Sequence, residues 1–73
     1  HLSKKTTKEK LLSFLSAESL KANSSSFTIE YNRQQLADYL SLDRSAMSNE
    51  LSKLRDQGII IYQKNSFQLL KPI

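Results

Sequence analysis

Polar side chains that can donate or accept hydrogen bonds gather in one short stretch, at Arg44, Ser45, Ser48 and Asn49. The apolar residues Met47, Leu51 and Leu54 recur among them at i, i+4 and i+7, which is the spacing of one helical face. The pattern predicts a helix over residues 44–57 with the polar side chains on its opposite arc. Arginine can pair with the N7 and O6 atoms of guanine, and asparagine with the N7 and N6 atoms of adenine. The arc is therefore suited to reading base edges in the major groove of duplex DNA.

The residues that must position this arc form another short helix just before it. Asn32 can accept a backbone N–H bond at a helix start and Gln35 can return one, as in a capping box. Asp43 can cap the following helix, and its charge suits the positive end of that helix dipole. Because only Ser41–Asp43 remains between the two helices, the stretch matches a DNA-binding helix-turn-helix. An ordinary helical hairpin with a solvated polar face is the alternative.

Small residues and turn residues fit the same arrangement. Ala37 suits the place where two helices approach closely, and Leu42 would fill the gap between them. Gly58 lies where a helix end favours a left-handed residue. Ser41 departs from the pattern, because glycine is the favoured residue at that turn position.

The flanking segments predict one more helix and three strands. Thr6 and Glu9 form a capping-box pattern that begins a helix running to about Lys21. Phe27, Ile29 and Tyr31 alternate with polar residues, which predicts a short half-buried strand. The β-branched run 59–63 and the apolar run 67–70 predict a hairpin with its tip at Lys64 and Asn65. The expected core residues are Leu11, Phe14, Leu15, Leu36, Leu40, Met47, Leu51 and Leu54.

This order of elements predicts a mainly α fold with a small antiparallel β-sheet, the winged helix-turn-helix. Three helices form a bundle and the hairpin forms the wing. The wing tip would bring Lys64, Asn65 and Ser66 near a phosphate backbone, where contacts position the protein without reading sequence.

Composition bounds the function. The 73 residues make one small domain, 38% hydrophobic and 25% charged, as in soluble globular proteins. There is no cysteine, which fits a cytoplasmic protein, and no apolar run approaches the roughly 18 residues that span a membrane. With one terminal histidine, one glycine and no base at helical spacing from Ser45 or Ser48, the chain lacks the groups of an enzyme site. No metal or cofactor is expected in this domain.

The charge is weaker support for a nucleic-acid partner. The formal net charge is +4, with 11 basic and 7 acidic residues, which suits a polyanion. Residues 32–57 are balanced, however, so the excess does not lie on the predicted motif. The early lysines could add phosphate contacts or simply solvate a helix start; they are Lys4, Lys5, Lys8 and Lys10.

The stretch FTIEYNRQQLADYLSLDRSAMSNELSKLRDQGII, followed by a short hairpin, resembles the C-terminal DNA-binding domain of Crp/Fnr-type bacterial transcription regulators. The resemblance covers residues 8–70 and is most specific in NRQQLADYL, LDRSAMSNELSKL and DQGII. It implies a regulator whose N-terminal sensor barrel and dimerisation helix lie outside residues 1–73, and whose effector is unknown. It also implies a homodimer on a pseudo-palindromic operator, in contact with RNA polymerase, with this fragment alone monomeric.

The resemblance also implies roles for individual residues. Bases would be read at Arg44, Ser45 and Asn49. Arg44 keeps the usual arginine of the family, whereas Ser45 and Asn49 stand where the best-known members have glutamate and arginine, so their operator sequence does not carry over. Phosphate would be contacted by the start of the first motif helix, at Asn32, Arg33 and Gln34.

Two other uses of such a fold stay open. A winged helix that binds protein would present an apolar patch with an aromatic anchor on the arc of residues 44–52, where this sequence has serine, asparagine and arginine. A winged-helix repressor family without a sensor barrel would differ only in its upstream sequence. Tyr39 and Tyr62 could stack on a ligand, but we favour tyrosines that close the edge of a core.

Overall fold

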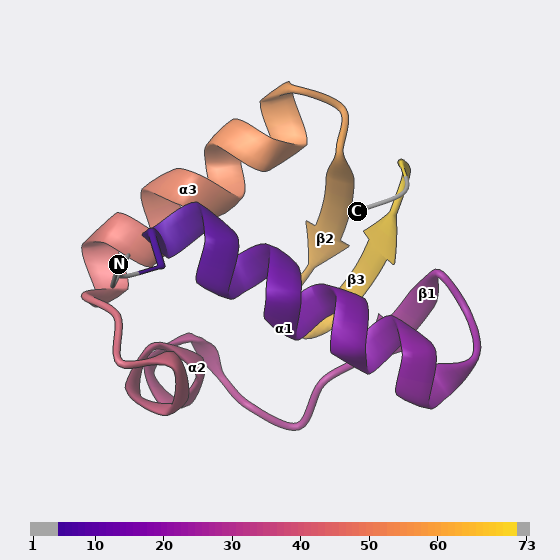
Figure 1. The fold of residues 1–73 in the computed structure, drawn as a ribbon, viewed down its shortest axis with the longest axis horizontal. Coiled ribbons are helices and arrows are strands. Elements are labelled where there is room, and N and C mark those ends of the chain that lie inside the picture. The colour runs from indigo at the N-terminus through magenta and orange to yellow at the C-terminus, as the bar shows by residue number, and fades with distance from the viewer. Residues whose placement is uncertain (1–4, 72–73) are drawn as a thin grey trace.

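The computed structural model describes residues 5–71, so the expectations for Lys4 and the terminal histidine lie outside it. The elements are α1 (Thr7–Ala22), β1 (Ser26–Thr28), α2 (Arg33–Leu40), α3 (Arg44–Asp56), β2 (Ile60–Gln63) and β3 (Ser66–Leu69). The strands form an antiparallel sheet in the order β1-β3-β2. In Figure 1, α1 crosses the front of the molecule; α3 lies above it and α2 below it on the left, and the strands lie toward the right. The predicted winged helix-turn-helix is confirmed.

The predicted caps set the starts of all the helices. Thr6 and Glu9 exchange hydrogen bonds at the start of α1, of 3.1 and 2.9 Å, and Asn32 and Gln35 do the same at α2, at 2.7 and 2.9 Å. At α3, the carboxylate of Asp43 accepts the Ala46 N–H at 3.0 Å. The Thr6 N–H bond stabilises the ionised carboxylate and holds the pKa of Glu9 below its ordinary value. Each helix therefore begins where a side chain satisfies its free N–H groups.

The core lies where the helices meet the sheet. Ala37 is completely buried, as a close approach of α2 requires. Leu40 was expected in this core but is only partly buried, because it ends α2 and borders an open hollow between α1 and α2. The buried apolar residues are Leu11, Phe14, Leu15, Phe27, Ile29, Leu36, Ala37, Met47, Leu51, Leu54, Ile60 and Phe67.

Several element boundaries differ from the prediction, and the hairpin strands are Ile60–Gln63 and Ser66–Leu69 rather than 59–63 and 67–70. The first strand ends at Thr28 rather than continuing to Tyr31, because its partner β3 begins at Ser66 and the chain before that is already turning. Ile29 makes one last bond, from its N–H to the Asn65 carbonyl, at 2.9 Å. Helix α3 ends at Asp56, and Gln57 is its C-cap rather than its last residue. Gly58 has the predicted positive φ, 73°.

Candidate nucleic-acid interface

The polar arc of α3 is exposed along the first half of the helix. Its side chains, the predicted base-reading residues, are all exposed: Arg44, Ser45, Ser48 and Asn49. On the opposite face Met47 and Leu51 are 0% and 1% exposed, which fixes how the helix is rotated about its axis. The hydrophobic contacts of α3 therefore leave this arc, and not another, facing solvent.

The turn between α2 and α3 is held from both sides. Ser41 adopts the left-handed conformation, with φ 57°, and Leu42 donates its N–H to the Ala37 carbonyl at 2.8 Å. The Lys10 ammonium of α1 donates to the Leu40 carbonyl at 3.2 Å and lies 3.5 Å from the Ser41 carbonyl. Lys10 thus neutralises the negative end of the α2 dipole. Sequence reasoning considered Lys10 only for phosphate or solvent, and no spacing rule connects it with residues so far along the chain.

The start of α2, the start of α3 and the wing turn meet around one open hollow of about 400 Å³. The structure thus brings together two groups of predicted phosphate-contacting residues and the first base-reading residue. The lining residues are Asn32, Arg33, Gln34, Arg44, Lys64 and Asn65. Ser66 does not line it, because its hydroxyl lies 3.4 Å from the Thr28 hydroxyl on the exposed face of the sheet.

The lining side chains differ in what they can still offer a ligand. The Asn32 side chain already caps α2, and Gln34 donates its amide to Asp38 at 3.0 Å. Lys64 is exposed, and its backbone has φ 54°, a conformation that favours glycine. Arg44 is exposed as well. Lys64 and Arg44 are therefore the solvent-facing cations of the hollow.

Arg33 is held differently, because its guanidinium contacts the wing. It is half-buried and donates a hydrogen bond to the backbone carbonyl of Lys64 in the wing turn. Its central carbon lies 5.0 Å from the ring centroid of Phe67 and 5.5 Å from that of Tyr62. Burial lowers the pKa of Arg33, although the group remains cationic near neutral pH.

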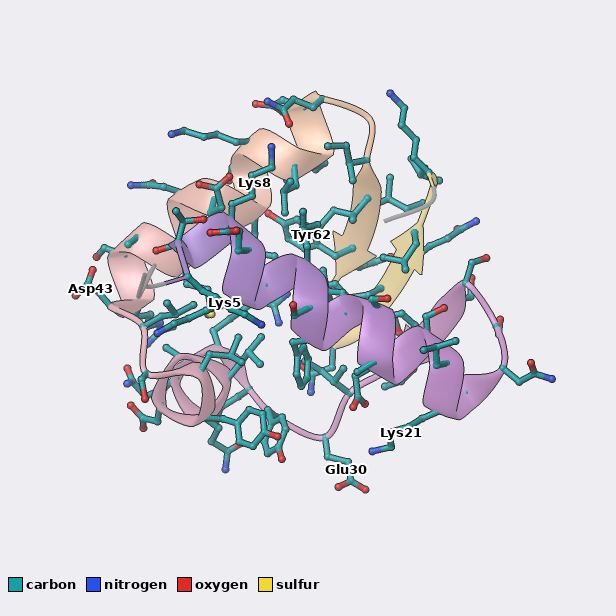
Figure 2. The ribbon with its side chains drawn as sticks, in the orientation of Figure 1. Lys5, Lys8, Lys21, Glu30, Asp43 and Tyr62 are labelled. Atoms are coloured by element: carbon teal, nitrogen blue, oxygen red, sulfur yellow. The ribbon has the colours of Figure 1, made fainter. Side chains whose placement is uncertain are left out.

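The two tyrosines considered for stacking have different surroundings. Tyr62, labelled near the centre of Figure 2, is half-buried, with its ring 5.8 Å from that of Phe67. A second guanidinium, that of Arg55 on α3, lies 5.4 Å from the Tyr62 ring. Tyr39, on α2, is 61% exposed, and its ring stacks on that of Tyr31 with the two centroids 5.2 Å apart. Tyr62 thus joins the wing to both motif helices, a contact that sequence spacing could not show.

Two further searches concern other kinds of site. Within residues 5–71 no group of histidine, cysteine, aspartate and glutamate side chains could hold a metal ion. No helix in the same range has the length and apolar character needed to cross a membrane.

Comparison with known proteins agrees with this geometry. The family described as "Crp-like helix-turn-helix domain" matches residues 9–72. Among solved structures, FixK2 from Bradyrhizobium japonicum superimposes with a TM-score of 0.84 at 28% sequence identity. The match covers 96% of this chain and 36% of that one, so the chain spans about a third of the FixK2 chain. No curated protein sequence matches the chain. The chain therefore belongs to the Crp-like helix-turn-helix family, and it is a DNA-binding domain of the Crp/Fnr type of transcription regulator.

Proposed function

We propose that this domain binds one half-site of a duplex DNA operator, with α3 in the major groove and the hollow seated on the phosphate backbone. The observation that carries the proposal is the common orientation of three segments. The exposed arc of α3 begins at Arg44, and Arg44 also lines the hollow formed with the start of α2 and the wing turn. Base-reading and backbone-binding groups are thereby presented to one ligand surface.

Within this proposal Arg44 reads a guanine and Asn49 reads an adenine, each through two hydrogen bonds. Ser45 and Ser48 are short and discriminate little, while they allow the helix to approach the groove floor. Lys64 contacts a phosphate from the wing, and Asn65 and Gln34 complete the backbone contacts. Asn32 orients α2 toward the backbone through its cap. Ser66 borders the interface from the sheet and contributes least.

A protein-binding role for the arc has less support. Within residues 5–71 the large apolar side chains that stay exposed are Leu20, Tyr39, Ile61 and Leu70, and all lie outside α3. Protein interfaces centre on buried aromatic and apolar anchors, whereas DNA interfaces are polar and cationic. The composition of the arc therefore favours DNA.

For the whole protein we propose a cytoplasmic, non-enzymatic homodimer that binds a pseudo-palindrome and contacts RNA polymerase. Two half-sites would then lie about 10 base pairs apart, one helical turn of the duplex. The effector would bind outside these residues, and the domain itself would need no cofactor. The family match and the shared fold with FixK2, a longer chain, support this arrangement.

The test is a titration of labelled duplex DNA with the 73-residue chain at several salt concentrations. We expect weak binding whose logarithm falls linearly with the logarithm of salt concentration, because lysine and arginine release condensed counterions. Binding that does not respond to salt, or no binding at low salt, would contradict the proposal.

A further inference from the structure

We propose that Arg33 is a positioning residue for the wing, and that it raises DNA affinity by fixing the Lys64 turn rather than by contacting phosphate itself. This inference rests on the proposed seating of the hollow on the DNA backbone. It gives Arg33 a role different from the direct phosphate contact that the resemblance implies.

The contacts of Arg33 all lead to the wing. The guanidinium donates to the Lys64 carbonyl, at the first residue of the two-residue turn between β2 and β3. It also lies over two rings of the wing strands, Tyr62 on β2 and Phe67 on β3. A planar guanidinium can stack on an aromatic face while its edge donates hydrogen bonds, which a lysine ammonium cannot do in the same way.

The β2–β3 ladder closes this turn at Gln63 and Ser66, but the turn itself contains a strained residue, which such support would steady. Lys64 has φ 54°, which costs a residue with a side chain energy that glycine avoids. The backbone bond that holds the turn from outside the wing runs from the Ile29 N–H to the Asn65 carbonyl. Arg33 is the first residue of α2, so its hydrogen bond fixes the position of the wing turn relative to the helix-turn-helix.

The Arg33 bond would set where the Lys64 side chain lies relative to α3. The Lys64 side chain must lie at a set distance from α3 if both are to reach one DNA duplex. Without the Arg33 bond, the turn loses its direct link with α2, and Lys64 no longer meets its phosphate reliably. Affinity then falls although no charge has been removed from the protein.

The substitution that separates the two roles is Arg33→Lys, which keeps the charge but removes the planar guanidinium. We expect Arg33→Lys to lose about five- to tenfold in affinity near 0.1 M salt and to lower the salt slope by about one, as Lys64→Gln does. The double variant should show no further loss, because both changes remove the same phosphate contact.

Arg55→Lys is the matched control, because Arg55 lies at a similar 5.4 Å from the Tyr62 ring but on α3. It should leave the salt slope unchanged. All measurements are made well below the thermal midpoint of each variant, so that a loss of stability alone does not alter the slope.

Three results would overturn the inference. An unchanged slope in Arg33→Lys, additive losses in the double variant, or an equal fall in Arg55→Lys would each do so. Should Arg33→Lys not fold, the wild-type chain gives the answer: the Arg33 guanidinium NMR signals should stay unshifted when DNA is added, and a shift typical of a phosphate contact would refute the role. Failure of the proposed function is distinct, since the wild type itself would then show no salt-dependent binding.

Discussion

Replacing Lys64 by glycine should stabilise the fold while weakening DNA binding. Lys64 stands in the left-handed region, with φ 54°, at the tip of the wing. That conformation costs a residue with a side chain roughly 1 kcal/mol, whereas glycine adopts it without strain. The greater freedom of glycine stabilises the unfolded chain by about 0.5 kcal/mol, which offsets part of this relief of strain. The free energy of unfolding should therefore rise by about 0.5 kcal/mol. For a domain of this size, that is a rise in Tm of roughly 2–4 °C.

The same substitution removes an exposed cation from the hollow. One phosphate contact contributes about 0.9 to the slope of log affinity against log salt, which corresponds to a loss of about five- to tenfold near 0.1 M salt. Stability and affinity should therefore move in opposite directions. A residue kept in a strained conformation is expected where function requires its side chain.

Thermal unfolding followed by circular dichroism gives the first quantity, and fluorescence anisotropy with labelled duplex gives the second. Lys21→Gln is the charge-matched control, because Lys21 is 76% exposed at the end of α1 and lies across the molecule from Asp43 in Figure 2. It should change affinity less than about twofold, the range expected of a distant, screened charge. The reasoning is refuted if Lys64→Gly lowers Tm, or if it binds DNA as tightly as the wild type.

Three further predictions concern the scaffold. Asp43→Ala removes the cap on the Ala46 N–H and should lower the free energy of unfolding by about 1 kcal/mol in a urea titration, with Asp43→Ser retaining most of it. Ala37→Leu adds volume at a position that is 0% exposed, and should cost about 1–3 kcal/mol in thermal unfolding. The hydrogen bonds with Thr6 lower the pKa of Glu9 in the folded state. The stabilisation that they give is present above the pKa of Glu9 in the unfolded chain, and it is lost as the pH falls through the lower pKa of the folded state. The protection of the Thr6 amide against hydrogen exchange, measured relative to its intrinsic rate at each pH, should therefore fall in acid, and Glu9→Gln should remove that pH dependence.

Local signals accounted for most of the fold. The caps at Thr6, Asn32 and Asp43 and the i, i+4, i+7 spacing in α3 each involve residues a turn or two apart, and the structure has all of them. The strand expected to reach Tyr31 was too long, because its end depends on where the distant β3 begins. Leu40 has an apolar side chain at the right helical spacing, but the helix ends there and its outer side stays open.

The candidate site was predictable in composition but not in its internal contacts. The polar arc follows from the periodicity of α3 alone. The bond of Arg33 to Lys64 and that of Lys10 to Leu40 join residues about thirty positions apart, and no sequence period encodes them. These contacts decide which cations face solvent and which serve the fold, so the roles of the individual cations required the structure.

The central claim is that α3 reads bases through Arg44 and Asn49, and a selection from a randomised duplex pool tests it most directly. The chain would be fused to a dimerising coiled coil and compared with Arg44→Ala and Asn49→Arg. We expect the wild type to recover half-sites with one preferred G·C pair and a nearby A·T pair. Arg44→Ala should lose the first preference at a cost of roughly 1–3 kcal/mol on that site, and Asn49→Arg should move the second toward guanine. Recovery of the same half-site by all three proteins would contradict the placement of α3 in the groove.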